Sequence, residues 1–287
     1  QGEDGTRAQR NMQVLGSLLP GRYDNFNQLY FAKRLQDPLA DKLPRQHINI
    51  SKAEAANEYS IQIKGFESDG ETVAAESALT AALSPHEDGR RVLMRFSSIL
   101  PLEKPSGYCD LIWRREAGQF RAELADPNCS QPDPVLPKQV EIAERDLWWS
   151  SSGDTPRLEF ERARLFSCYL DVPGVGGGKA IPYKWYELGE LHDKSEPRWV
   201  TLQDGTELSV RLTNVRWPMN NLKGIFTRHS FVIYLGERQG KVTKEIAYSW
   251  THPDAQRIGL NVKTAVVSCL MLSNETSGTM FRGEQRR

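Results

Sequence analysis

The stretch from Gly107 to Cys129 constrains the fold of this chain more than any other. It reads GYCDLIWRREAGQFRAELADPNC, two runs of alternating apolar and polar residues separated by Ala117 and Gly118. Alternation with a period of two gives each run one apolar face, which is typical of paired β-strands. Glycine supplies the backbone freedom that a tight connection needs. The sequence therefore predicts a β-hairpin that forms one wall of a larger sheet.

A cysteine lies at each end of this hairpin. Because the two strands run back beside each other, Cys109 and Cys129 can approach within bonding distance. A disulfide there would close a loop of about 20 residues and contribute roughly 3 kcal/mol on the chain-entropy description. Two unpaired buried thiols are the alternative.

The other two cysteines, Cys168 and Cys269, stand near the two ends of the C-terminal half. A disulfide joining the first and last strands of that half is one interpretation, and free thiols are the other. The chain has no C-x-x-C and no histidine pair at metal-ligand spacing, so disulfides explain the four cysteines better than a metal site does. Disulfides persist in oxidising compartments, and we therefore expect a periplasmic or secreted protein.

Length and charge narrow the class of protein further. The 287 residues predict two domains, or one large β domain with an extension. Lysine plus arginine equals aspartate plus glutamate at 37 each, so no bulk charge favours nucleic acid or anionic lipid as a partner. No apolar run approaches 18 residues, and we predict no membrane-spanning helix.

The N-terminal part begins with a polar segment that we expect to be frayed, residues 1–11. Apolar residues then recur at three- and four-residue spacing from Met12 to Leu19, which predicts a short helix that stops at Pro20 and Gly21. The aromatic- and amide-rich segment that follows is predicted to hold a turn and a second short element.

From residue 46 the pattern changes to strands. Alternation predicts strands over 46–51 and 59–65, another after Asp88 and Gly89, and two short ones over 139–144 and 147–151. The alanine-rich segment 71–83 is predicted to be helical. Residues 157–170 are predicted to form a strand, with a helix as the alternative.

Residues 172–180 (VPGVGGGKA) form a predicted loop and the expected domain boundary. Beyond it, strand patterns recur at roughly ten-residue spacing, the signature of an antiparallel sandwich or barrel. They cover residues 184–191, 198–202, 207–217, 230–238, 241–250 and 261–273. The predicted fold class is mainly β.

No enzymatic motif stands out. Gly174, Gly178 and Lys179 are one residue short of P-loop spacing, and Ala180 lacks the hydroxyl that such a loop places on magnesium. Neither G-x-S-x-G nor H-E-x-x-H occurs. The histidines are dispersed; His47 begins a strand and either faces a barrel interior or is structural. We predict no catalytic residue and leave open whether the chain is an enzyme.

Several features in order resemble the CpcT/CpeT family of chromophore lyases. Near the N-terminus they are Gly21, Tyr23, Asn25 and Gln28, within LLPGRYDNFNQ. The strand that opens with His47 follows, and then the hairpin GYCDLIWRREAGQF with a second cysteine after it. The resemblance covers about half of the chain.

The resemblance implies an antiparallel, calyx-like β-barrel over residues 12–170 with a short N-terminal helix, often paired as a homodimer. A second β-sandwich-like domain over residues 171–287 has no counterpart in the smallest lyases. Such barrels bind a bilin, an open-chain tetrapyrrole, and deliver it to a cysteine of a phycobiliprotein. By position, the implied ligand-binding residues are Tyr23, Asn25, Gln28, His47, Tyr59 and Trp113.

Two functions follow as expectations. The first is a binding protein for a small hydrophobic or tetrapyrrole-like ligand, with bilin transfer as a further step. The second is a non-catalytic structural or interaction protein of the cell envelope. For Asn25 and Gln28 there is also a structural alternative, in which both brace the N-terminal segment against the barrel through local backbone bonds.

Overall fold

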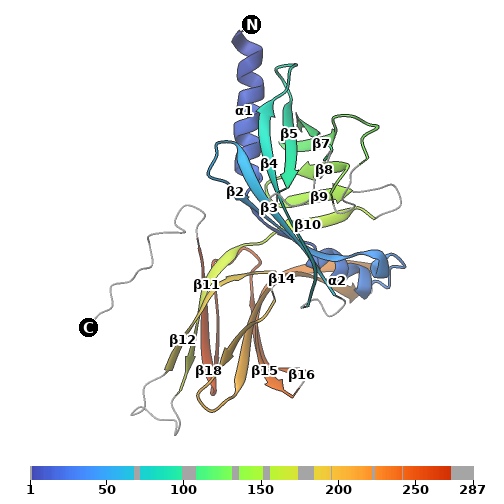
Figure 1. Cartoon of the computed structure of the whole chain (residues 1–287). Coiled ribbons are helices and arrows are strands. Elements are labelled where there is room, and N and C mark those ends of the chain that lie inside the picture. Colours follow the sequence, from blue (N-terminus) through green and yellow to red (C-terminus); the bar gives the residue numbers. More distant parts are fainter. Residues whose placement is uncertain are drawn as a thin grey trace, which may run out of the picture. The chain divides into compact units, whose positions relative to one another are not determined.

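The computed structural model describes residues 2–67, 72–98, 108–130, 136–150, 156–173, 184–194, 196–221, 224–240 and 242–272. It confirms a mainly β, antiparallel fold (Figure 1). The chain divides into two compact units, Gln1–Arg162 and Ala163–Arg287. The boundary predicted after residue 170 instead falls inside a strand of the second unit, β11 (Leu165–Val172). The predicted loop 172–180, with the rejected P-loop pattern, lies mostly outside the described residues.

The first unit is a closed barrel in which β1 pairs with both β2 and β10. All neighbouring strands are antiparallel, and every step except the closure joins strands consecutive in sequence. The strands are β1 (Gly21–Asp24), β2 (Arg45–Lys52), β3 (Glu58–Phe66), β4 (Val73–Pro85), β5 (Val92–Ser98), β6 (Leu111–Glu116), β7 (Gln119–Leu124), β8 (Gln139–Ile142), β9 (Asp146–Ser150) and β10 (Leu158–Arg162). The helices of this unit are α1 (Gly2–Leu18), α2 (Phe26–Arg34) and the 3-10 turn η1 (Ala40–Lys42).

The barrel interior is the core of the first unit. Every strand directs alternate apolar side chains into one cluster, as the period-two pattern requires. Leu15 and Leu19, at the end of α1, are buried in the same cluster. The interior is therefore built from side chains of the wall and of the helix together.

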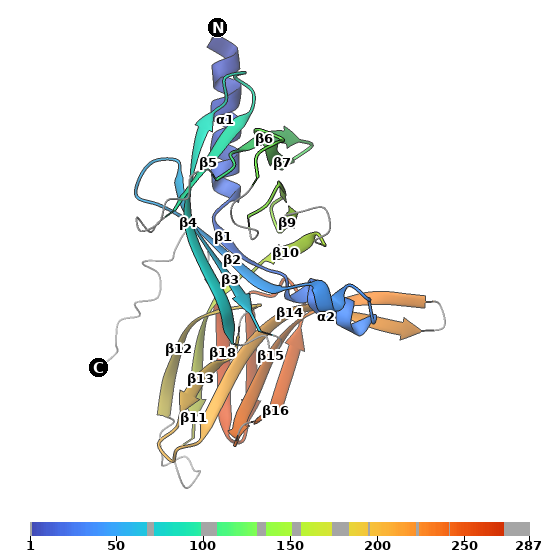
Figure 2. The same ribbon diagram turned by 45° about the vertical axis from the view of Figure 1, so that its right-hand side comes forward.

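Helix α1 begins ten residues earlier than the predicted start at Met12, so the expectation of a frayed segment 1–11 is wrong. Its middle is held by the turn between β4 and β5. The Ala8 amide donates to the Gly89 carbonyl at 3.0 Å, and Asn11 Nδ2 donates to the Arg90 carbonyl at 3.0 Å. Both anchoring residues are buried, and α1 runs beside β4 and β5 (Figure 2).

The helix predicted over residues 71–83 is wrong, because this segment forms β4. Alanine favours helices locally, but β4 pairs with β3 over residues 73–82 and with β5 over residues 79–85. Leu79, Ala81 and Leu83 alternate into the barrel core. Burial of that face and pairing on both edges outweigh a helix propensity of a few tenths of a kcal/mol per residue.

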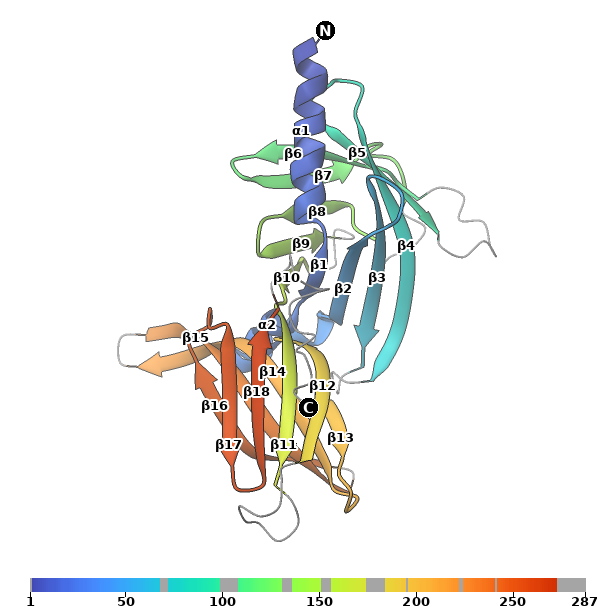
Figure 3. The same cartoon turned by 90° about the vertical axis from the view of Figure 1, so that its left-hand side faces the viewer.

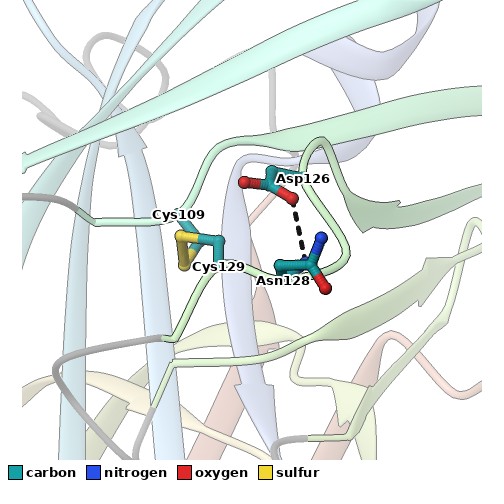
Figure 4. The surroundings of a disulfide bond; sticks show 4 residues. All are labelled: Cys109, Asp126, Asn128 and Cys129. Atoms are coloured by element: carbon teal, nitrogen blue, oxygen red, sulfur yellow. Dashed lines mark hydrogen bonds between the residues drawn. A yellow bond between two sulfur atoms is a disulfide. The ribbon is translucent and has the colours of Figure 1, made fainter.

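The hairpin predicted between Gly107 and Cys129 is confirmed, and its strands are β6 and β7. Its connecting residues Ala117 and Gly118 have φ angles of 43° and 92°, as a tight two-residue turn requires. The disulfide Cys109–Cys129 is also confirmed, with 5.8 Å between Cα atoms (Figure 4). A turn aligns the second cysteine, since Asp126 Oδ1 accepts from the Asn128 amide at 2.9 Å and its carbonyl accepts from the Cys129 amide at 3.0 Å.

The second unit contains two four-stranded antiparallel sheets, ordered β12-β11-β18-β17 and β13-β14-β15-β16 (Figure 3). One apolar cluster draws on both sheets, so they pack face to face as a sandwich. The remaining strands are β12 (Lys184–His192), β13 (Arg198–Thr201), β14 (Glu207–Asn221), β15 (Gly224–Gln239), β16 (Val242–Thr251), β17 (Arg257–Val262) and β18 (Ala265–Met271).

Two details of the second unit refine the sequence prediction. Residues 157–170 are strand, as predicted, but they form β10 of the barrel and β11 of the sandwich. The single strand predicted over 261–273 is instead a hairpin of β17 and β18. Cys168 and Cys269 lie directly opposite each other on β11 and β18, with 4.2 Å between Cα atoms, and their disulfide is confirmed.

Candidate functional site

The barrel wall divides the six predicted ligand-binding residues into two groups. Tyr23, Tyr59 and Trp113 belong to the interior core cluster. His47 lies on the opposite face of β2 from Ile48 and Ile50, which point inward. The remaining two, Asn25 and Gln28, lie on the segment that carries α2. The structure therefore brings three of the six residues together in the interior.

Tyr23 is fully buried, and its hydroxyl binds the C-terminal end of α1. Tyr23 Oη donates to the Leu18 carbonyl at 2.7 Å and lies 3.2 Å from the Leu19 carbonyl. Arg162 Nη2 also reaches the Leu18 carbonyl and donates to Tyr23 Oη at 2.6 Å. A cation at this end complements the helix dipole. Burial raises the pKa of the Tyr23 phenol, and Arg162 offsets only part of that rise.

Tyr59 lies against the same helix. A Cβ atom at Gly16 would be closer to Tyr59 Oη than real Cβ contacts permit, so this approach depends on glycine. The Tyr59 residue is 4% exposed, and burial raises the pKa of its phenol. The last turn of α1 thus fits between tyrosines of β1 and β3.

Trp113 places the polar nitrogen of its indole ring in the barrel interior. The residue is 2% exposed, and its indole Nε1 is buried with no hydrogen-bond acceptor among the described residues. A buried donor without a partner costs about 1–3 kcal/mol, and such groups in native proteins call for an explanation. An acceptor that belongs to a bound molecule is one such explanation.

His47 belongs to a polar cluster on the outer side of the wall. His47 Nε2 contacts the Asp24 carboxylate, which also accepts from Arg45 Nη1 at 2.6 Å. Arg22 Nη2 lies 3.1 Å from His47 Nδ1 and donates to it. Both ring nitrogens are therefore engaged, which leaves neither open to a substrate in this geometry.

Asp24 is 1% exposed and is the electrostatic centre of this cluster. Burial alone would raise the pKa of its carboxyl, but Arg45 and then His47 outweigh burial and hold the pKa at about 2. Two aromatic rings cover the cluster. Phe66 lies 4.5 Å from the His47 ring, and the Arg45 guanidinium lies 5.6 Å from the Phe26 ring centroid. The ions are therefore paired and shielded from water, as buried charges require.

Asn25 and Gln28 hydrogen-bond to backbone groups, as expected if these two residues brace the N-terminal segment against the barrel. Asn25 Nδ2 donates to the Pro44 carbonyl at 2.7 Å, and its Oδ1 accepts from the Gln46 amide at 2.8 Å. Gln28 Nε2 donates to the Arg157 carbonyl at 2.8 Å, and its Oε1 accepts from the Glu159 amide at 2.9 Å. Each side-chain amide thus completes the hydrogen bonding of a neighbouring strand, β2 or β10.

Sequence reasoning missed Asp24 and Arg45, which form the outer polar cluster with His47. It also missed Arg162, which binds Tyr23 and the end of α1. The signal for Asp24 was present, because strand alternation beside Tyr23 places it on the outer face with His47 opposite it. The role of Arg162 depends on closure of the barrel, which sets β10 beside β1. Sequence spacing contains no sign of that pairing.

Comparison with known protein families, with curated proteins and with solved structures found no match. Within the described ranges, no helix has the length and apolar character needed to cross a membrane. Among those same residues, no three His, Cys, Asp or Glu side chains are grouped to hold a metal ion. Two disulfides, Cys109–Cys129 and Cys168–Cys269, are compatible with an oxidising environment.

Proposed function

We propose that this protein binds a small, largely apolar, tetrapyrrole-like ligand in the interior of its barrel, in the periplasm or outside the cell. The resemblance of the N-terminal motifs and hairpin to the CpcT/CpeT family motivates the ligand class. The barrel supplies the matching chemistry, with aromatic and aliphatic side chains from every strand and few polar atoms.

The observation that carries the proposal is the buried indole of Trp113, which has no hydrogen-bond acceptor among the described residues. A bilin is apolar over most of its surface and carries carbonyl acceptors at its ends, and a lactam carbonyl would accept from Trp113 Nε1. Leu15 of α1 and Leu19, the residue that follows α1, share the core with Trp113, so a bound ligand would lie beside them or take their place. The free energy gained at Trp113 would offset part of that rearrangement.

The proposal is for binding. Transfer to an acceptor protein would need only orientation of the ligand near an acceptor thiol, which can by itself supply several kcal/mol. The outer cluster of His47, Asp24 and Arg45 faces away from the interior and has no part in the proposed binding.

Titration of the full-length protein with biliverdin, followed by visible absorbance and tryptophan fluorescence, tests the proposal. We expect saturable binding in the micromolar range and about tenfold weaker binding by Trp113→Phe, the equivalent of one lost hydrogen bond. Trp148→Phe is the matched control, since Trp148 lies on β9 with its ring beside Arg157 and outside the core cluster. No spectral change at tens of micromolar biliverdin, with folding intact, would refute binding.

A second candidate is a structural or interaction protein without a ligand. The observation in its favour is the dense interior of the barrel. The core cluster draws residues from α1 and from all ten strands, and each of these core residues is no more than 5% exposed. A homodimer is the simplest assembly under this reading. Light scattering on the purified chain tests that form, and a monomer across the micromolar range would exclude it.

A further inference from the structure

One face of the sandwich carries five aromatic side chains, of which two are exposed and three are partly buried. In the sheet β13-β14-β15-β16, Val210, Leu212 and Ile233 point into the core, so the alternate residues point outward. Five of these outward positions are aromatic: Trp199, Trp217, Tyr234, Tyr248 and Trp250. Tyr248 is 59% exposed and Trp250 is 55% exposed. Two aromatic side chains of β16 are thus left mostly in solvent, while Trp199, Trp217 and Tyr234 are partly buried.

Arginines alternate with these rings. The guanidinium of Arg238 lies 4.2 Å from the ring centroid of Trp199, and that of Arg211 lies 4.6 Å from Tyr234. The guanidinium of Arg228 lies 4.4 Å from the Trp250 ring. The three pairs together draw on all four strands of this sheet, and they form what we call the aromatic–arginine face.

The charges of this face are only partly balanced. Arg238 has an ion pair with Glu207 at 3.1 Å. Arg211 and Arg228, by contrast, have no carboxylate partner among the residues that the structure describes. Two stacked cations therefore remain available on the surface, and a partner with negative charge would complement them.

Stacking also prepares these arginines for binding. A guanidinium that lies on a ring keeps its in-plane N–H donors free, and these donors match the two oxygens of a carboxylate. Arg211 lies over the Tyr234 ring, and the Tyr248 ring lies 6.2 Å from it in a tilted arrangement. Cross-strand pairs of this type stabilise a sheet by about 0.5–1 kcal/mol each. The stability of the sheet therefore does not explain why more than half of the surface of Tyr248 and of Trp250 is exposed to solvent.

We propose that the aromatic–arginine face is a docking site for a protein partner that presents acidic side chains. Tryptophan, tyrosine and arginine are the residues that dominate binding energy at protein interfaces. A second copy of this chain is disfavoured, because a two-fold interface through the same face would bring like charges together. This site lies in the second unit and is independent of ligand binding by the barrel.

Binding of poly-L-glutamate to the full-length protein at low salt, followed by tryptophan fluorescence and biolayer interferometry, tests the proposal. We expect saturable binding that weakens as salt is raised, and about tenfold weaker binding by Arg211→Gln/Arg228→Gln. The matched control is Arg257→Gln/Lys263→Gln, which removes two exposed positive charges from the other sheet and should bind as the parent does.

Two further measurements separate the proposal from its rivals. Arg211→Lys/Arg228→Lys keeps both positive charges but loses the planar guanidinium groups that stack on the rings and donate two parallel hydrogen bonds. This variant should still bind poly-L-glutamate less tightly than the parent, and its melting temperature should stay within a few degrees of the parent value. Alginate and single-stranded DNA serve as alternative polyanions. Absence of poly-L-glutamate binding, equal losses in the control variant, or binding of alginate or DNA in preference to poly-L-glutamate would overturn the proposal.

Discussion

Replacement of Asp24 by asparagine should destabilise the barrel more than any other single change of charge on its wall. The carboxylate is buried and holds both Arg45 and His47. Its pKa of about 2 lies well below the ordinary value of 3.8, which corresponds to about 2 kcal/mol at neutral pH. Loss of the anion also leaves Arg45, whose side chain is only 10% exposed, without a counter-charge, so we expect a total cost of about 3–5 kcal/mol.

The sign of the pH dependence follows from the lowered pKa. Above about pH 5 the carboxylate is ionised in both the folded and the unfolded state and contributes its full stabilisation. As the pH falls from about 4 toward 2, the folded protein must take up a proton at Asp24 and that contribution is lost. The Asp24→Asn variant should therefore show a flatter decline of stability over this range than the parent does.

Urea unfolding combined with hydrogen exchange measures this effect in the correct unit. Protection of β1 and β2 should fall in Asp24→Asn while protection of β14 and β15 is unchanged, because the cluster lies in the first unit. Asp41→Asn, an exposed carboxylate on η1, is the matched control. A cost below about 1 kcal/mol with an unchanged acid limb would refute the electrostatic reasoning.

Three other changes test the packing. Gly16→Ala should lower the melting temperature of the barrel because its Cβ meets Tyr59 Oη, and Tyr59→Phe in the same chain should restore part of the loss; no rescue would mean that the contact is not the cause. Loss of the Cys168–Cys269 disulfide in a double alanine variant should cost more than loss of Cys109–Cys129, roughly 5 against 3 kcal/mol, because the closed loop spans 101 rather than 20 residues; equal costs measured by urea unfolding would contradict the chain-entropy account. Gln28→Ala should cost about 1–2 kcal/mol through two lost backbone bonds, and Gln28→Glu should not restore the one donated to Arg157.

Strand alternation was sufficient to predict most of the fold. The hairpin of β6 and β7 and most strands of the second unit follow from a period of two, because one face of each strand must be buried. The same rule failed for β4, whose run of alanine and serine has weak alternation. It also failed at β17 and β18, where the short turn at Lys263 lacks glycine and proline.

The site was less predictable than the fold. Alternation along β3 and β6 predicts that Tyr59 and Trp113 face the interior, and both side chains lie there. His47 occupies an outward position on β2 by the same alternation, which the sequence argument left open. The bonds of Tyr23 to α1 and of Gln28 to β10 depend on contacts between residues far apart in the sequence. Only the three-dimensional closure of the barrel creates these contacts.

The most direct test of ligand binding is the NMR signal of a single proton. The indole N–H of Trp113, assigned by its absence from the spectrum of Trp113→Phe, should shift downfield and exchange more slowly when biliverdin is added. The Trp148 indole signal should remain in place. If the Trp113 signal is unchanged at saturating biliverdin, the barrel interior does not hold this ligand and the proposed function fails.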